Sequence, residues 1–149
     1  MSDKSISIGV KAIITDITNS KFLVIIRKQC ENLSFSEKYD IPGGRINFGE
    51  EPLEGLKREI DEEIGYRIKS KPILLDAENI QLTGNNQIIR LTYLLKEGID
   101  LSKVILGNEH SQADMLPLAE NPGFHPLLNQ AINICNEYFL GVKEHETNS

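Results

Sequence analysis

The sequence predicts a layered α/β domain, and two kinds of pattern support this. Two runs rich in β-branched and apolar residues, Ile6–Thr15 and Lys21–Arg27, predict strands joined by the polar turn Asp16–Ser20. Two other segments, one beginning near Pro52 and one near Pro126, carry apolar residues at helical spacing. Because the chain has 149 residues, 40% of them hydrophobic, we expect one domain over residues 1–149 with strands and two main helices interleaved.

Three later segments complete the predicted sheet. Strands are expected at about Ile68–Asp76, Gln87–Leu95 and Met115–Leu118. The polar, glycine-containing stretches Thr83–Asn86 and Gly107–Asp114 indicate loops between them.

Both predicted helices have clear start signals. Pro52 suits a first helical turn and Gly65 suits the position just past a helix end, so the first helix is expected between them. The second begins at His125-Pro126 and is expected to end before Gly141, with a polar tail at about residues 143–149 that frays.

Composition argues against several classes of protein. The net charge is −6, from 16 Lys and Arg against 22 Asp and Glu, so a nonspecific nucleic-acid-binding surface is not expected. No stretch approaches the roughly 18 apolar residues of a membrane span, and the first ten residues lack a signal-peptide pattern. We expect a cytoplasmic protein whose two cysteines, Cys30 and Cys135, are ordinary thiols.

An acidic cluster near the end of the first helix is the main clue to function. Glu59 lies three and four residues before Glu62 and Glu63, so the three carboxylates share a helix face and repel one another. Such oxygen ligands suit Mg²⁺ or Mn²⁺ together with substrate phosphates. A solvated acidic helix is the plainer interpretation. Gly55, in mid-helix, indicates either a close approach to the acidic flank or the packing of a neighbouring loop.

The spacing around this cluster decides between these interpretations. The segment Gly44–Tyr66 resembles the signature of the Nudix hydrolase family over all 23 of its positions. Tyr66 is the one departure, because the family usually has Ile, Leu or Val there. The fixed positions that match are Gly44, Glu50, Arg58, Glu59, Ile60, Glu62, Glu63 and Gly65.

The resemblance implies a fold, an activity and a set of roles. It implies an α/β/α sandwich with a mixed β-sheet, and a MutT-like pyrophosphohydrolase that cleaves a nucleoside diphosphate linked to another group. By position, Glu59, Glu62 and Glu63 would be carboxylate ligands to Mg²⁺ or Mn²⁺, and the Gly43 carbonyl a further ligand. Beside Gly44, Glu50 would brace the loop against the helix and Arg58 would orient the glutamates, unless Arg58 merely pairs with Glu54 on the surface.

Resemblance extends beyond this segment. Glu37–Gly44 is similar to the strand and loop that precede the signature, and Gly107–His110 to a later loop that supplies another acidic residue. Glu109 is therefore a candidate metal ligand, and it competes with Glu59 for the role of general base. His110 is expected to be a loop residue and not a catalyst. Other candidates are Arg27, Lys28 and Arg45 for phosphates, and Phe35, Tyr39, Phe48 and Tyr93 for stacking on a base.

The leading functional prediction is metal-assisted attack of water on a phosphorus atom, with Glu59, Glu62 and Glu109 as catalytic candidates. The expected partner is a small nucleotide diphosphate derivative, with a nucleoside triphosphate ahead of other substrates. A homodimer is left open. Two alternatives are a non-catalytic nucleotide-sensing module and, less favoured, a diphosphate isomerase. The intact acidic cluster argues against the first, and the absence of Trp and of a cysteine motif argues against the second.

Overall fold

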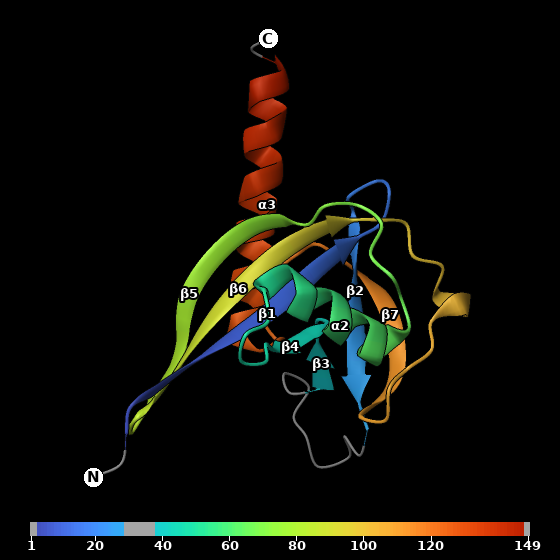
Figure 1. Ribbon diagram of the computed structural model, residues 1–149. Helices are drawn as coiled ribbons and strands as arrows, with labels where there is room; N and C mark the ends of the chain where they lie inside the picture. The colour runs from blue at the N-terminus through green and yellow to red at the C-terminus, as the bar shows by residue number, and fades with distance from the viewer. Residues whose placement is uncertain (1–2, 29–37, 148–149) are drawn as a thin grey trace.

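The computed structural model describes residues 3–28 and 38–147, and it confirms the predicted α/β/α sandwich with a mixed sheet. Helix α2 (Pro52–Ile64) lies in front of the sheet and helix α3 (Pro126–Thr147) behind it, as Figure 1 shows. Glu37, Phe35 and Cys30, which the sequence singled out, lie outside the described residues.

The sheet is built around β1 (Ser5–Thr15). This strand pairs in parallel with β6 (Asn86–Lys96) along its whole length, from Ser5 opposite Asn86 to Thr15 opposite Lys96. Strand β5 (Ile73–Thr83) adds to β6 as an antiparallel hairpin whose turn includes Gly84, with a φ of 57°. The order along the sheet is β3-β2-β1-β6-β5.

The other edge of β1 is shared by two strands, and this arrangement creates the site. Strand β2 (Lys21–Arg27) pairs with it only at Thr15 opposite Phe22. The short strand β4 (Gly43–Arg45) pairs with it antiparallel further back, with Gly43 opposite Lys11. Strand β2 in turn carries β3 (Tyr39–Asp40) and β7 (His110–Pro117).

Alternating residues of the central strands divide the core between the two faces of the sheet. One cluster joins Val10, Ala12, Ile14, Leu23 and Ile25 to Leu56, Ile60 and Ile64 of α2. The other joins Ile13, Phe22 and Val24 to Leu128, Ala131, Ile132 and Cys135 of α3. Because side chains alternate along a strand, each strand supports both helices.

Two predicted strands have other bounds in the structure. Strand β5 begins at Ile73 and not near Ile68, because residues 69 and 70 form a loop whose amides donate to the Glu97 carboxylate. It also continues past the expected end near Asp76 to Thr83, because it pairs with β6 as far as Thr83 opposite Asn86. Strand β7 begins at His110, within the stretch expected to be a loop, because these polar residues extend the β2 edge by backbone pairing.

The C-terminal helix is longer than expected. Helix α3 continues through Gly141 to Thr147, so the expected end before Gly141 was wrong, whereas the fraying of the polar tail at about residues 143–149 stays a prediction. A Cβ at Gly141 would meet nothing within 4 Å. A helix therefore passes this glycine at a cost of only about 1 kcal/mol relative to Ala.

The first helix, by contrast, has the predicted bounds. Pro52 is its first residue, and Gly65 follows its end in the left-handed conformation with φ 65°. Among the described residues, no helix is long and apolar enough to cross a membrane.

Candidate active site

The loop between β3 and α2 is pressed against β1 and α2, and two glycines make this contact. Gly43 has a φ of 142°, and a Cβ there would lie 2.0 Å from the carbonyl oxygen of Val10. A Cβ at Gly44 would lie 2.6 Å from the carboxylate carbon of Glu59. Real Cβ atoms do not approach other atoms so closely, so Gly43 needs to be glycine, and any larger residue at Gly44 would displace the Glu59 carboxylate. The Glu59 carboxylate consequently packs directly on the loop backbone.

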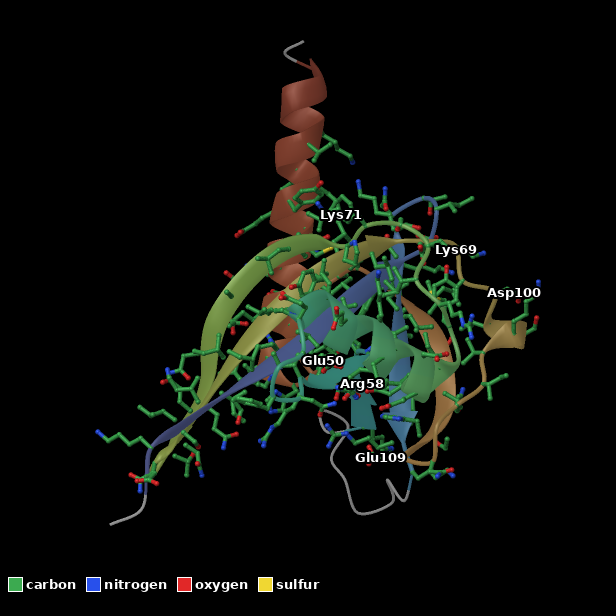
Figure 2. The ribbon with its side chains drawn as sticks, in the orientation of Figure 1. Glu50, Arg58, Lys69, Lys71, Asp100 and Glu109 are labelled. Carbon is green, nitrogen blue, oxygen red and sulfur yellow. The ribbon has the colours of Figure 1, made fainter. Side chains whose placement is uncertain are left out.

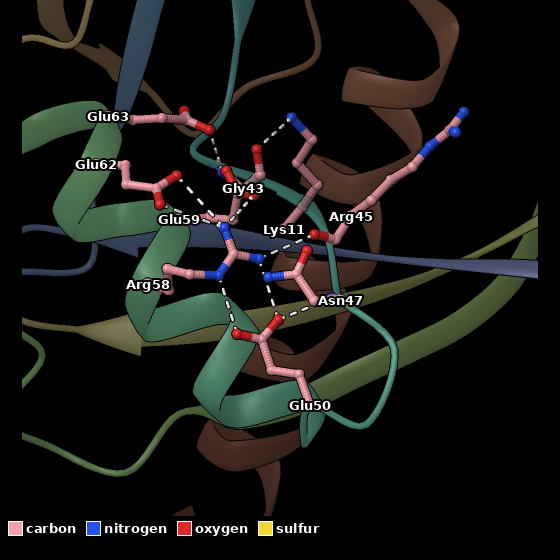
Figure 3. A network of polar contacts seen from close by, with 9 residues as sticks. All are labelled: Lys11, Gly43, Arg45, Asn47, Glu50, Arg58, Glu59, Glu62 and Glu63. Atoms are coloured by element: carbon pink, nitrogen blue, oxygen red, sulfur yellow. Dashed lines mark hydrogen bonds and ion pairs between the residues drawn. The ribbon is translucent and has the colours of Figure 1, made fainter.

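Arg58 gathers the carboxylates of α2, as Figure 3 shows. Its Nε and Nη2 atoms donate to the two carboxylate oxygens of Glu50 at 2.9 and 3.0 Å. Its Nη1 donates to Glu59 at 2.9 Å and, more weakly, to Glu62 at 3.4 and 3.5 Å. Arg58 thus contacts Glu50, Glu59 and Glu62, in place of the surface pair with Glu54 that the sequence left open.

Glu50 ties this arginine to the loop. Its carboxylate accepts from the Asn47 amide at 2.9 Å, and its own amide donates to the Asn47 carbonyl at 3.0 Å. Hydrogen bonds from the Arg58 side chain and the Asn47 amide lower the pKa of Glu50 to about 2. The same Glu50 contact, with a smaller contribution from Glu59, raises the pKa of Arg58. Arg58 also donates to the Arg45 carbonyl at 3.1 Å, so loop and helix are joined at several points.

Gly55 serves this packing and not an open approach. A Cβ on Gly55 would lie 2.6 Å from the Ile46 side chain and 3.0 Å from the Glu50 carboxylate. The loop-packing interpretation of this glycine is therefore the one that the structure supports.

Glu63 lies in a different environment from its neighbours. One carboxylate oxygen accepts from the Gly43 amide at 3.3 Å, and the other, Oε2, is buried and has no partner in the described part of the chain. Burial raises the pKa of Glu63 to about 7, against the opposing effects of Lys11 and the Gly43 amide. Glu59 and Asp40 raise it further by repulsion. A cation beside Oε2 would satisfy this carboxylate.

The oxygen atoms of Glu59, Glu62, Glu63 and the Gly43 carbonyl suit a hard divalent cation, although these side chains are not gathered around one point. Among residues 3–28 and 38–147, no three His, Cys, Asp or Glu side chains form a ready-made metal cluster. Glu59 and Glu62 are instead held by Arg58, and Glu62 is 59% exposed and only weakly bound. The observation that favours a bound cation is the buried, unpartnered oxygen of Glu63 next to the Gly43-Gly44 backbone.

The loop before β7 reaches the same place. The Gly107 amide donates to the Glu63 carbonyl at 2.9 Å, and a Cβ at Gly107 would lie 2.7 Å from the Glu62 carbonyl, so the loop packs on the end of α2. The Glu109 carbonyl accepts from the Lys28 amide at the end of β2. In Figure 2, Glu109 lies at that end of the sheet, below Arg58.

Two cavities meet at this edge of the sheet. The first, which we call the charged hollow, has a volume of about 400 Å³ and is lined by Gly43, Glu63, Glu109, His110, Lys11, Arg27, Lys28 and Asp40. The second, the apolar pocket, has a volume of about 520 Å³ and lies between the sheet and the start of α3. Its lining includes Ile80, Ile88, Leu127 and Leu128, with Tyr39, Arg45, Arg90 and His125.

The predicted candidates separate between these cavities. Arg27 faces both cavities and Lys28 only the charged hollow, whereas Arg45 faces only the apolar pocket. In Figure 3 the Arg45 side chain extends away from the glutamates. Of the aromatic candidates, Tyr39 lines the apolar pocket, Tyr93 is a core residue at 6% exposure, and Phe48 is fully exposed.

His110 and Cys135 also find their places. His110 is the first residue of β7 and lines the charged hollow, where burial lowers its pKa. Cys135 lies on α3 and is buried in the core, and burial raises the pKa of its thiol to about 12. It cannot act as a catalytic thiol there.

Sequence reasoning missed Lys11, Asp40 and Arg90. Each lies on a strand and lines a cavity. A charged residue within an otherwise apolar strand, such as Lys11 in the run Ile6–Thr15, was the available signal. Its partners became visible only with the pairing of β1 and β4.

Comparisons with known proteins agree with this geometry. The model of the NUDIX domain family matches residues 7–133. The 8-oxo-dGTP diphosphatase of Haemophilus influenzae is 37% identical over 128 residues, which cover 78% of this chain and 90% of that protein.

Solved structures share the fold. The MutT protein from Methanosarcina mazei Go1 aligns with a TM-score of 0.70 and 23% identity, over 93% of this chain and 98% of its own. The MutT NUDIX hydrolase from Burkholderia pseudomallei aligns with a TM-score of 0.68 and 19% identity, over 87% and 98%. The family match spans most of the chain, and the 37% identity to a diphosphatase favours the predicted hydrolase over the sensing module and the isomerase. The chain therefore belongs to the Nudix family and is a hydrolase that acts on diphosphate bonds.

Proposed function

We propose that this protein is a nucleoside triphosphate pyrophosphohydrolase, which releases a nucleoside monophosphate and pyrophosphate. The observation that carries this proposal is the meeting of the apolar pocket with the charged hollow beside Glu63. An apolar pocket with a few polar groups suits a nucleobase, and a hollow beside the unpartnered Glu63 carboxylate oxygen suits a phosphate chain with its cation.

The relative from Haemophilus influenzae makes a purine triphosphate the first substrate to test. That protein is an 8-oxo-dGTP diphosphatase. Tyr39 and the apolar side chains of the pocket offer a surface on which a purine can stack. We therefore place 8-oxo-dGTP first and dGTP second among the candidates.

The roles of the acidic residues remain those that the sequence predicted. Glu59, Glu62 and Glu63, with the Gly43 carbonyl, would hold Mg²⁺ or Mn²⁺, which supplies positive charge against the phosphate oxygens. Arg58 holds Glu59 and Glu62 and is itself fixed by Glu50, so it positions these side chains. Gly44 leaves room for Glu59.

Two glutamates are candidates for taking the proton from the attacking water. Glu59 lies against the Gly44 backbone and accepts a hydrogen bond from Arg58. Glu109 lines the charged hollow together with Glu63. Separate Glu59→Gln and Glu109→Gln variants, assayed across pH, would assign the base, because loss of the base removes the acid limb of the pH–rate profile.

The direct test is a product analysis. Purified protein with Mg²⁺ is incubated with 8-oxo-dGTP, the four dNTPs, a nucleotide sugar and a dinucleoside tetraphosphate, and the products are resolved by anion exchange. We expect monophosphate and pyrophosphate from a triphosphate, fastest with 8-oxo-dGTP. Release of orthophosphate alone, or turnover only of the sugar or dinucleotide, would contradict the proposal. A cytoplasmic location and a homodimeric state stay predictions.

A further inference from the structure

Three residues form the boundary between the two cavities. Lys11, Arg27 and Asp40 line both the apolar pocket and the charged hollow. A nucleotide with its base in the pocket and its terminal phosphates in the hollow must cross this boundary with the phosphate nearest the nucleoside. The groups at the boundary therefore meet that phosphate first.

The Lys11 ammonium is held in place by the chain itself. It donates to a carboxylate oxygen of Asp40 and to the Ile41 carbonyl, both at 3.1 Å, and to the Gly43 carbonyl at 3.4 Å. This position follows from the sheet, because Lys11 and Gly43 are direct partners in the pairing of β1 with β4. Figure 3 shows the ammonium reaching the Gly43 backbone next to Glu63.

Asp40 fixes the two cations of the boundary together. Its Oδ2 atom accepts from Lys11 at 3.1 Å and from Arg27 at 3.3 Å. The boundary thus carries two positive charges against one carboxylate, which leaves a net positive site between the apolar pocket and the charged hollow. An anionic group is the ligand that such a site favours.

We propose that Lys11 is a substrate-binding residue that donates to the phosphate nearest the nucleoside and thereby sets how far the nucleotide enters the charged hollow. This inference rests on the proposed function for the orientation of the ligand. Its chemistry, a cation that reads a nucleoside phosphate, needs no hydrolysis.

One of the three Lys11 contacts is suited to exchange. The bond to the Gly43 carbonyl, at 3.4 Å, is longer than the usual range for N–H···O bonds, whereas those to Asp40 and Ile41 are within it. A phosphate oxygen can replace the Gly43 carbonyl as acceptor of the third ammonium N–H, so the number of hydrogen bonds made by Lys11 does not fall. The exchange would also free the Gly43 carbonyl, on the side of the loop that faces Glu63.

Lys11 suits this task better than Arg27. The Lys11 side chain is 22% exposed and that of Arg27 is 53% exposed. Hydrogen bonds to charged groups are stronger where water is excluded, so the shielded ammonium contributes more to phosphate binding.

The test measures binding in EDTA, so that neither metal nor turnover contributes. Affinities for dGMP and for deoxyguanosine are measured by NMR titration on wild-type protein, Lys11→Met, Lys11→Arg, Arg27→Met and, as a matched charge control far from both cavities, Lys21→Met. Loss of one charge-assisted hydrogen bond should weaken dGMP binding by about 10-fold or more in Lys11→Met. Deoxyguanosine should bind equally well to the wild-type protein and to Lys11→Met, and Lys11→Arg should recover part of the dGMP affinity.

Several results would overturn the inference. These are equal loss of dGMP and deoxyguanosine binding in Lys11→Met, unchanged dGMP binding in that variant, a larger effect in Arg27→Met, or no dGMP binding to the wild-type protein at millimolar concentration. Loss of triphosphate hydrolysis is a separate outcome. If the wild-type protein hydrolyses no triphosphate yet binds dGMP through Lys11, the proposed function fails and this inference stands.

Discussion

Two glutamates, Glu97 and Glu63, have pKa values that are shifted in opposite directions, although burial acts on both in the same direction. Glu97, at the end of β6, is 8% exposed, and its carboxylate accepts from the Lys69 and Ser70 amides at 2.7 and 2.6 Å. Burial alone would raise the pKa of Glu97, but bonds from the Tyr66 hydroxyl and these amides outweigh it and lower the pKa. Glu63, near the end of α2, accepts one bond of 3.3 Å, and burial raises its pKa to about 7.

The difference separates a structural carboxylate from a site carboxylate. The groups that donate to Glu97 belong to Tyr66, Lys69 and Ser70, which follow Gly65 in the chain. Tyr66 is the one position at which the signature segment departs from the usual family pattern. In each of the two carboxylates, Oε2 is buried and has no hydrogen-bond partner among the described residues. The difference lies in the other donors, because the Tyr66 hydroxyl and two short amide bonds act on Glu97, whereas Glu63 accepts one longer bond from Gly43. The fold therefore stabilises the charged form of Glu97 and destabilises that of Glu63, which a cation would stabilise.

The largest expected difference is in activity. Glu63→Gln should lower kcat/KM for the best triphosphate by roughly 10²–10⁴-fold, because a ligand of the cation is lost at the reacting phosphate. Glu97→Gln should stay within about three-fold of wild type when assayed well below its melting temperature. Steady-state kinetics at saturating Mg²⁺ measure both. Equal losses in the two variants would remove the distinction between the two carboxylates.

The next effect tests the packing of Glu59 on the loop. In Gly44→Ala the new Cβ would stand 2.6 Å from the Glu59 carboxylate carbon, so this side chain must leave its bond to Arg58. We expect kcat/KM to fall by about 10–100-fold, as for other losses of positioning around metal ligands. The matched control is Gly141→Ala, because a Cβ there meets nothing within 4 Å. That variant should keep full activity. Wild-type activity in Gly44→Ala would contradict the claim that the Glu59 carboxylate must pack on the Gly44 backbone for catalysis.

Stability at neutral pH should depend on Glu97. Its pKa is lower in the folded state than the ordinary 4.5, so the charged form stabilises the fold above about pH 4.5, and this contribution is lost as pH falls through the lowered pKa. Glu97→Gln should therefore cost about 1–3 kcal/mol at pH 7, and the cost should shrink in acid. Urea unfolding at pH 7 and at pH 3.5 measures it. A cost that is the same at both pH values would show that charge is not involved.

Glu63 should have the opposite and smaller effect. Its folded pKa of about 7 exceeds the ordinary 4.5, so the charged carboxylate destabilises the metal-free fold above pH 7, and the penalty disappears as pH falls to about 4.5. In EDTA at pH 8, Glu63→Gln should be more stable than wild type by roughly 1 kcal/mol, a value discounted for partial exposure. The two proteins should be equally stable at pH 4.5. A destabilised Glu63→Gln at pH 8 would contradict the burial of an unsatisfied charge.

Local patterns predicted the scaffold of the site well. The helix from Pro52 to Gly65 and the strands β1 and β2 have the expected bounds, because caps and runs of apolar residues act over short distances. The bounds of β5 and β7 were wrong because their ends depend on distant partners, the Glu97 carboxylate for residues 69 and 70, and the β2 edge for His110–Asp114.

The site residues also separate into those that local spacing predicts and those that depend on distant partners. The spacing of the acidic residues is local, and it identified Glu50, Arg58, Glu59, Glu62 and Glu63 as a set. Lys11 was missed because its contacts with Asp40 and Gly43 exist only when β4 pairs with β1. The sequence also did not predict the apolar pocket, because its lining comes from six strands, β1 to β6, and from the start of α3.

The pKa of Glu63, measured with and without a cation, shows whether this carboxylate binds the metal ion. Carboxylate ¹³C shifts of protein labelled at glutamate Cδ, with Glu63→Gln to assign the signal and Glu97→Gln as the reference, would be followed from pH 3 to pH 9. We expect Glu63 to titrate near 7 in EDTA and at least one unit lower with saturating Mg²⁺, while Glu97 titrates below 4.5 in both. A Glu63 pKa near 4.5 that Mg²⁺ does not change would contradict the claim that the fold leaves this carboxylate for a cation.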